Sequence, residues 1–303
     1  MTLQQLEYII AVNTYRHFSK AAEACGVTQP TISAQVQKLE EELGVPIFDR
    51  RTVPLTVTMA GELIVKQAAE AVRATQRMVE TAHSVKNQAS GEVRIGMVTS
   101  VAPYLMPPLV QYMRQSCPEV RIHCFEGSKS ILVGKIQRGE LDMLVMANAT
   151  QVPNLLAIPL YTENILAYLP ANSPLLAQEE LSVETLRREQ VWAYRDMQES
   201  VFGTELRDMS AEFETGSLFT LLALAEANGG VMLAPQTIID ILLSERIDYL
   251  RPITDPAPTR VVQLYVREDY VMEQLLNVVG EAVCNIVPEP MLDDHLQKFG
   301  IKL

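Results

Sequence analysis

The 303-residue sequence predicts an α/β protein with three parts: an N-terminal winged helix-turn-helix, a linker helix and a two-lobed α/β domain. Three observations support this fold class. Residues 18–43 contain two helical patterns joined by a glycine turn. Residues 59–88 repeat small and apolar side chains at spacings of three and four. From residue 92 onward, short apolar runs alternate with helical patterns, which is typical of βαβ units and a parallel sheet.

The first pattern predicts a helix-turn-helix. Ala21 and Ala22 allow a second helix to approach closely, and Gly26 suits the tight turn between them. Thr28 offers an N-cap hydroxyl, and Pro30 falls in the first turn of the second helix, where a missing N–H costs nothing. One apolar face of that helix is expected to be buried; it consists of Ile32, Val36, Leu39 and Leu43.

The second helix begins with small polar side chains, and such an end fits the major groove of double-stranded DNA. Residues 47–58 predict two short strands with arginines near their turn, a wing that places guanidiniums beside the duplex backbone. An amphipathic helix over 3–12 covers both elements. We therefore expect DNA contacts from Thr28, Gln29, Pro30, Thr31, Ser33, Gln37, Lys38, Arg50 and Arg51.

Several linked blocks of the sequence resemble the LysR-type transcriptional regulators. They are LQQLEY at 3–8, FSKAAEA at 18–24, TQPTIS at 28–33, KLEEELG at 38–44, FDR at 48–50 and LTVTMAG at 55–61. The resemblance implies a cytoplasmic, homodimeric or homotetrameric DNA-binding transcription factor that senses a small-molecule effector, with RNA polymerase as a further candidate partner. A solute-binding or sensor module whose N-terminal domain binds a protein stays open as an alternative.

Residues 16–30 are most similar to the peroxide-sensing branch of that family. The resemblance implies a reactive and a resolving cysteine in the segment corresponding to about 195–210. This sequence has no cysteine there; its four cysteines are at 25, 117, 124 and 284. A thiol switch needs an activated thiolate and a second sulfur within reach. We therefore expect a noncovalent effector, with a redox-responsive regulator as the alternative.

Composition narrows the functional class. The net charge is −12, yet residues 1–90 hold nine basic and nine acidic residues, so the excess negative charge lies in the remainder. A neutral DNA-binding domain predicts modest nonspecific affinity and a need for two copies. No apolar run is long enough to span a membrane, and the N-terminus does not read as a signal peptide. Scattered cysteines without CxxC fit a reducing cytoplasm.

Enzymatic chemistry is not predicted. The sequence has no GxSxG nucleophile elbow, no HExxH zinc helix and no glycine-rich phosphate loop after a strand. Its four histidines, at 17, 83, 123 and 295, are too dispersed for a metal site. We therefore expect no catalytic residues, no metal ligands and no cofactor.

The linker over 59–88 predicts pairing of two chains. Val65, Ala68, Val72, Thr75, Val79 and Ala82 alternate spacings of three and four, and Val65, Ala68, Val72 and Val79 are the expected dimerisation residues in this seam of small side chains. The alternative is a single amphipathic helix lying on its own domain. Residues 87–91 break the helix and suggest a hinge.

The expected domain boundaries are 1–58 for the winged helix-turn-helix, 59–88 for the linker and 92–303 for the effector-binding domain. Chain crossings near 161 and 265 divide the last into lobe I (92–161 and 265–303) and lobe II (162–264). Lobe II is expected to begin with a strand at 164–169 and to contain helices at 182–189 and 236–244. The family resemblance implies a likeness to periplasmic solute-binding proteins.

A ligand site is expected between the lobes. Open α/β sheets bind ligands outside the carboxyl ends of their strands, and helix N-termini hold anions. Ordinary helix caps are the alternative role for the same hydroxyls. The candidate effector-binding residues are Thr99, Ser100, Ser128, Phe202, Thr215 and Ser217.

Overall fold

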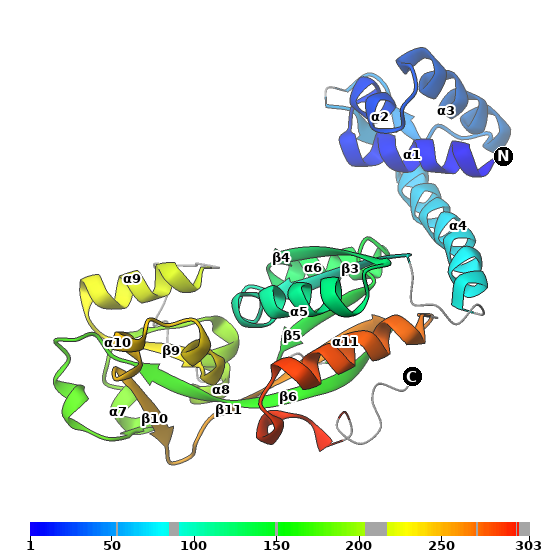
Figure 1. Cartoon of the computed structure of the whole chain (residues 1–303). Coiled ribbons are helices and arrows are strands. Elements are labelled where there is room, and N and C mark those ends of the chain that lie inside the picture. The colour runs from blue at the N-terminus through cyan, green and yellow to red at the C-terminus, as the bar shows by residue number, and fades with distance from the viewer. Residues whose placement is uncertain are drawn as a thin grey trace. The chain divides into compact units, whose positions relative to one another are not determined.

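The computed structural model describes residues 1–52, 54–84, 91–148, 151–203, 217–270, 272–294 and 296. The chain divides into two compact units, residues 1–86 and 87–303, which we call the head and the body (Figure 1). The expected Thr215, the end of the linker at 85–88 and residues 204–210 of the 195–210 segment lie outside the described residues. None of the described helices is long and apolar enough to cross a membrane.

The head is a winged helix-turn-helix followed by a long helix. Its elements are α1 Leu3–Tyr15, α2 Phe18–Ala24, α3 Gln29–Leu43, β1 Phe48–Asp49, β2 Thr56–Val57 and α4 Met59–Ser84. Strands β1 and β2 pair antiparallel and form the predicted wing. The turn before α3 contains Gly26 at φ +66°, a left-handed conformation that glycine adopts without strain.

Three of the four residues on the predicted apolar face of α3 are fully buried: Ile32, Val36 and Leu39. The prediction that Leu43 is also buried was wrong, because its side chain is 39% exposed. Helix α3 ends at Leu43, and Gly44 follows in the left-handed conformation. The last turn therefore extends past the packed core of the head.

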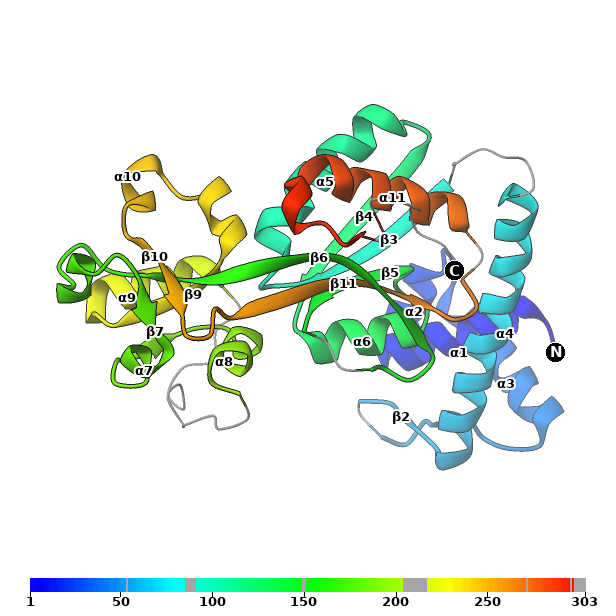
Figure 2. The ribbon, with the colours of Figure 1, turned by 90° about the horizontal axis from the view of Figure 1, so that it is seen from below.

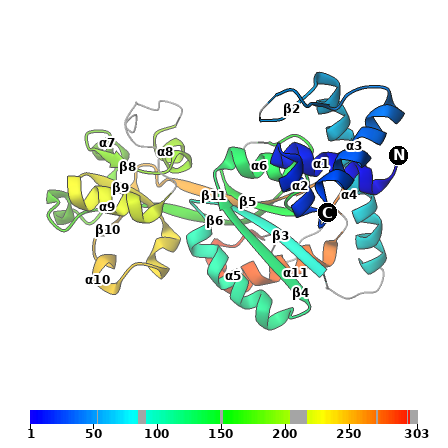
Figure 3. The same ribbon diagram turned by 90° about the horizontal axis from the view of Figure 1, so that it is seen from above.

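Lobe I of the body is a sheet covered on both faces. Its first elements are β3 Gly91–Val98, α5 Ala102–Ser116, β4 Val120–Gly127, α6 Lys129–Gln137 and β5 Met143–Ala147. Strand β3 pairs parallel with both β4 and β5, as the βαβαβ pattern predicts. Helices α5 and α11 (Glu273–Ile286) cover one face and α6 covers the other (Figure 3).

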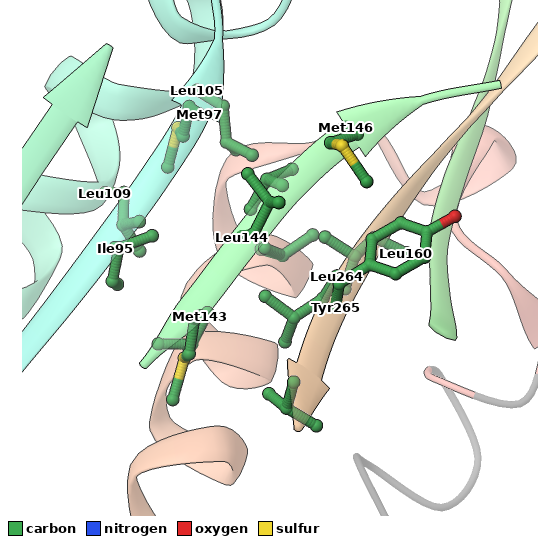
Figure 4. Close-up of a cluster of buried hydrophobic side chains, with 14 of the residues drawn as sticks. Ile95, Met97, Leu105, Leu109, Met143, Leu144, Met146, Leu160, Leu264 and Tyr265 are labelled. Atoms are coloured by element: carbon green, nitrogen blue, oxygen red, sulfur yellow. The ribbon is translucent and has the colours of Figure 1, made fainter. Parts of the chain in front are cut away.

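The core of lobe I lies between the sheet and these helices. Figure 4 shows Leu105 and Leu109 of α5 beside Ile95 and Met97 of β3, and all four are buried. Leu264 on strand β11 (Thr259–Arg267) belongs to the same core. Packing explains the glycine at position 96 in β3, because a Cβ there would lie 2.6 Å from the Leu141 side chain.

Two long antiparallel strands, β6 Leu155–Tyr168 and β11 Thr259–Arg267, connect the lobes (Figure 2). The sequence-based prediction began the first strand at 164, but β6 starts nine residues earlier and crosses without a break. The predicted second crossing near 265 was too late, because Val262 already pairs with β5 and belongs to the lobe I core. The register of the two strands shifts between Val262 and Gln263.

Lobe II has its own core and extends the same sheet. Its strands are β7 Leu181–Ser182, β8 Val191–Trp192, β9 Val231–Pro235 and β10 Leu250–Thr254; its helices include α7 Val183–Leu186, α8 Arg195–Phe202, α9 Leu218–Asn228 and α10 Ser244–Ile247. The helix predicted at 182–189 is the single turn α7. The helix predicted at 236–244 is a 3₁₀ turn, Gln236–Asp240 (η2), followed by α10. Short 3₁₀ turns also lie at Pro174–Ala177 and Glu289–Met291.

Candidate nucleic-acid interface and interlobe site

The N-terminal end of α3 is open to solvent. Gln29, Pro30 and Thr31 are exposed, as are Gln37 and Lys38 about two turns further on. Pro30 occupies the first turn, as predicted. The buried face of α3 packs on α1 and α2, so these polar side chains form the outer face of the helix.

Thr28 occupies the N-cap position, but its side chain does not cap the helix. Its hydroxyl lies 2.8 Å from the Thr31 hydroxyl instead. The predicted N-cap bond was therefore wrong, and no N-cap side chain blocks the positive end of α3. Free N–H groups at a helix start attract phosphate oxygens.

The wing arginines differ in their surroundings. Arg50 bonds Glu40 through Nη2 (3.1 Å) and Ser33 through Nη1 (3.3 Å), so two residues predicted to contact DNA contact each other. Arg51 is exposed, and its backbone N–H donates to Asp49. Among the described wing residues, Arg51 is thus the cation better placed for a phosphate.

Two of the four linker residues expected in a seam between chains are buried in their own head. Val65 and Ala68 are 8% and 3% exposed because they belong to the core of their own head, and Val72 packs against that core. The side chain of Val79 lies outside the described residues. Their burial agrees with the alternative reading, a helix lying on its own domain, along this face of α4. The opposite face exposes Met59, Leu63 and Met78.

A buried ion-pair network joins the two lobes where β6 and β11 cross. Arg260 on β11 lies opposite Glu163 on β6, and both side chains are 0% exposed. The guanidinium contacts Glu163 Oε1 at 2.8 Å and Asp196 Oδ2 at 3.1 Å. It also donates to the Ser100 carbonyl at 2.8 Å. One cation thus binds the end of β3 in lobe I and α8 in lobe II.

The remaining oxygens of this network are also bonded. Glu163 Oε2 accepts from the Thr237 backbone N–H (3.2 Å) and hydroxyl (2.8 Å). The Ser100 hydroxyl donates to Asp196 Oδ2 at 2.9 Å. Burial lowers the pKa of Arg260, but the carboxylates of Glu163 and Asp196 raise it more, so the guanidinium stays protonated.

Two tyrosines beside this network have unsatisfied hydroxyls. Tyr104 and Tyr194 are 8% and 7% exposed, and neither hydroxyl has a hydrogen-bond partner among the described residues. Burial raises the pKa of both phenols, so both hydroxyls stay protonated. Tyr104 belongs to α5 of lobe I, but its side chain packs in the core of lobe II. A buried hydroxyl without a hydrogen-bond partner is rare, which suggests that water or a ligand atom forms the missing hydrogen bond.

A second polar contact between the lobes lies at the end of β5. Asn148 exchanges bonds with Val261, accepting its N–H on Oδ1 (3.0 Å) and donating its own N–H to the Val261 carbonyl (2.9 Å). Its side-chain amide donates to Ser200 on α8. Asn148 therefore connects β5, β11 and α8.

Five of the six predicted effector-binding residues are described by the structure, and of these only Ser100 belongs to the network around Arg260. Thr99 lies half-buried at the end of β3. Ser128 is exposed before α6, and its hydroxyl contacts Ser130. Phe202 packs in the lobe II core, with the Arg187 guanidinium over its ring. Ser217 accepts from the Thr220 N–H as an ordinary helix cap.

Sequence reasoning missed Glu163 and Arg260. Each is a charged residue inside a strand of apolar and β-branched neighbours, and buried charges must be paired. That pattern could have suggested a buried ion pair, although not its partners. Asp196 and Ser200 lie on α8, the helix that ends at the predicted residue Phe202.

The cysteines provide no activated thiol. Cys25, Cys117, Cys124 and Cys284 are all free, and burial raises the pKa of each thiol. A nucleophilic cysteine needs the opposite shift, because the thiolate is the reactive form. No cluster of potential metal ligands occurs among the described residues either.

Comparisons with known proteins agree with this architecture. Residues 3–62 match the bacterial regulatory helix-turn-helix of the lysR family, and residues 86–283 match the LysR substrate binding domain. The chain is 28% identical over 308 residues to the DNA-binding transcriptional dual regulator OxyR of Escherichia coli, covering 98% of each protein. It is 26% identical over 300 residues to a hydrogen peroxide-inducible genes activator of Haemophilus influenzae, covering 95% of this chain and 97% of that one.

A solved structure supports the same assignment. A full-length OxyR variant from Pseudomonas aeruginosa is similar with a TM-score of 0.78 and 28% identity, over 97% of this chain and 98% of that one. The two family models together cover both the head and the body. The resemblance to LysR-type regulators, the two-lobed α/β fold and the non-enzymatic class are thereby confirmed. The chain belongs to the LysR family of bacterial transcriptional regulators.

Proposed function

We propose that the head reads double-stranded DNA through the exposed start of α3, with Gln29 and Thr31 at base edges and Arg51 at phosphate. The observation that supports this most directly is the solvent-open N-terminal end of α3 beside a paired wing. Arg50 and Ser33 take part through their mutual bond. In this proposal residues 1–58 bind DNA, residues 59–88 form the linker and residues 92–303 bind the effector. RNA polymerase is a candidate partner at the promoter, and the protein acts in the cytoplasm.

The test is selection of duplexes from random DNA by the purified protein, followed by quantitative binding of the enriched sequence. Gln29→Ala should reduce affinity for that sequence by about 1–3 kcal/mol and relax base preference at one position. Arg51→Ala should weaken all duplexes about equally and lower the salt slope by about 1. Failure of the wild-type protein to enrich any sequence would contradict DNA reading and favour a head that binds protein.

The protein works as a homo-oligomer in this proposal, with paired chains meeting along α4. Two of the four residues originally assigned to the seam are buried in their own head, so the contact moves to the opposite face. That face exposes Met59, Leu63 and Met78, large apolar side chains that a second copy of α4 would cover. A neutral head gains useful DNA affinity only when two copies bind together.

The effector site lies in this proposal between the lobes, near Ser100, Tyr104 and Tyr194. Two unsatisfied buried hydroxyls favour a ligand that both accepts and donates hydrogen bonds. Arg260 already contacts two carboxylates, so the local charge is net negative. A neutral or cationic small molecule therefore fits better than a carboxylate. Thr99 is retained as a nearby candidate, and Thr215 stays a candidate on the sequence alone, whereas Ser128, Phe202 and Ser217 have other structural roles.

A peroxide-responsive regulator is the second candidate, because several relatives are hydrogen peroxide-inducible genes activators. The two candidates differ in chemistry that can be measured. Peroxide sensing by thiols predicts a fast, reductant-reversible disulfide that changes the DNA footprint. Noncovalent sensing predicts slow, scattered thiol oxidation and an unchanged footprint after a small excess of peroxide. The raised thiol pKa values favour the noncovalent effector.

A further inference from the structure

A single carboxylate, that of Glu40, connects the recognition helix to the wing. Glu40 lies in the last part of α3, and its side chain is 13% exposed. Its Oε1 accepts the backbone N–H groups of Ile47 (2.8 Å) and Phe48 (3.1 Å), at the start of the wing. Its Oε2 pairs with Arg50 Nη2 at 3.1 Å. One side chain thus holds both the entry and the exit of β1.

The guanidinium of Arg50 is held from two more directions. Its Nη1 donates to the Ser33 hydroxyl at 3.3 Å, and its carbon lies 5.2 Å from the centroid of the Phe18 ring. That ring packs edge-on against Phe48 of β1 at 6.2 Å. Arg50 is consequently a bridge between α2, α3 and the wing, rather than a side chain that extends freely into solvent.

We propose that Glu40 is a positioning residue for DNA recognition. It acts through Arg50, which orients the Ser33 hydroxyl on α3 and holds the wing at a defined angle to the recognition helix. Charge-assisted bonds of this kind restrict side chains before the DNA arrives, so less ordering remains for the binding step. This inference rests on the proposed DNA-reading role of the head.

If Glu40 positions the DNA-contacting residues, removal of its negative charge should lower DNA affinity, which is the opposite of the usual effect. Loss of an acidic residue near DNA strengthens binding when only electrostatics change, because repulsion from phosphates falls. Glu41 provides the matched control: it is the next residue of α3, is exposed, and bonds only Gln37 among the described residues. Glu41→Gln should leave affinity unchanged or slightly higher. Glu40→Gln should lower affinity for the selected duplex about tenfold, which corresponds to ~1.4 kcal/mol.

The experiment uses the full-length protein, a duplex enriched from random DNA by the wild type, and a scrambled duplex of equal composition. Glu40→Gln should lower affinity for the selected duplex more than for the scrambled one, so discrimination falls. A double variant, Glu40→Gln with Arg50→Gln, should bind like Arg50→Gln alone, because residues in one network are not additive. A general loss of head stability would lower both duplex affinities equally.

Each other outcome is decisive. Equal behaviour of Glu40→Gln and Glu41→Gln overturns the inference and leaves DNA reading intact. Additive losses in the double variant also overturn it, because Glu40 would then act without Arg50. If circular dichroism shows that Glu40→Gln unfolds the head, Arg50→Lys replaces it; wild-type discrimination in that variant overturns the proposal, since lysine cannot hold two partners in a fixed geometry. A wild type that enriches no duplex overturns the proposed DNA-reading role and this inference together.

Discussion

Removal of Arg260 should strongly destabilise the body. In Arg260→Met, the Glu163 carboxylate stays buried at 0% exposure and loses its cation. Breaking one partner of a buried pair costs about 3–5 kcal/mol. Asp196 is 21% exposed, so water can solvate it and it adds little to that cost. We therefore expect a loss of about 3–5 kcal/mol in the free energy of unfolding at neutral pH.

Urea unfolding followed by tryptophan fluorescence measures this effect in the full-length protein. Trp192 is the only tryptophan, lies on β8 in lobe II, and donates to the Gly229 carbonyl. Arg188→Met is the control, because Arg188 and Glu184 form an exposed pair and its loss should cost under about 1 kcal/mol.

The double variant, Glu163→Gln with Arg260→Met, should recover much of the stability. Replacing a buried ion pair by uncharged groups is often neutral, and Gln keeps an oxygen for the Thr237 donors. An Arg260→Met protein as stable as Arg188→Met, or a double variant no more stable than Arg260→Met, would refute the reasoning.

Three further outcomes follow from the described contacts. Leu63→Glu should lower the mass measured by light scattering while the head stays folded, because Leu63 is 67% exposed. Val65→Glu is the contrasting variant and should unfold the head, because Val65 is buried in its core. An unchanged mass for Leu63→Glu would place the dimer contact elsewhere. Tyr104→Phe should be neutral or stabilising by up to about 1 kcal/mol in urea, since its hydroxyl has no partner among the described residues; a marked loss would mean that the hydroxyl is bonded in solution. Iodoacetamide should label Cys124 more slowly at pH 7 than it labels a cysteine peptide, because burial raises the thiol pKa. The labelling rate of Cys124 should increase as the pH rises toward that pKa. A rate at pH 7 equal to that of the peptide would contradict an inert thiol.

Much of the fold could be predicted because local periodicity encodes it. The α3 face, the glycine turn, the wing and the parallel βαβαβ order of lobe I were all predicted from residue spacing. The errors lie where local signals end. Residues 236–244 have helical composition, yet they form a 3₁₀ turn and a separate short helix. Spacing likewise could not tell which face of α4 is buried, because Val65 and Leu63 are both apolar and only packing on the head separates them.

The sequence by itself determined the family, the order of the elements in the head and lobe I and the absence of a cysteine pair in the 195–210 segment, because these depend on residues close together in the chain. Only the tertiary structure decided the interlobe network. Arg260 reaches Glu163 across 97 positions, Asp196 across 64 and Ser100 across 160. The same holds for Arg50, which meets Ser33 across 17 positions. Partner choice for a buried charge depends on which distant segments pack beside it, and no periodicity within one segment contains that information.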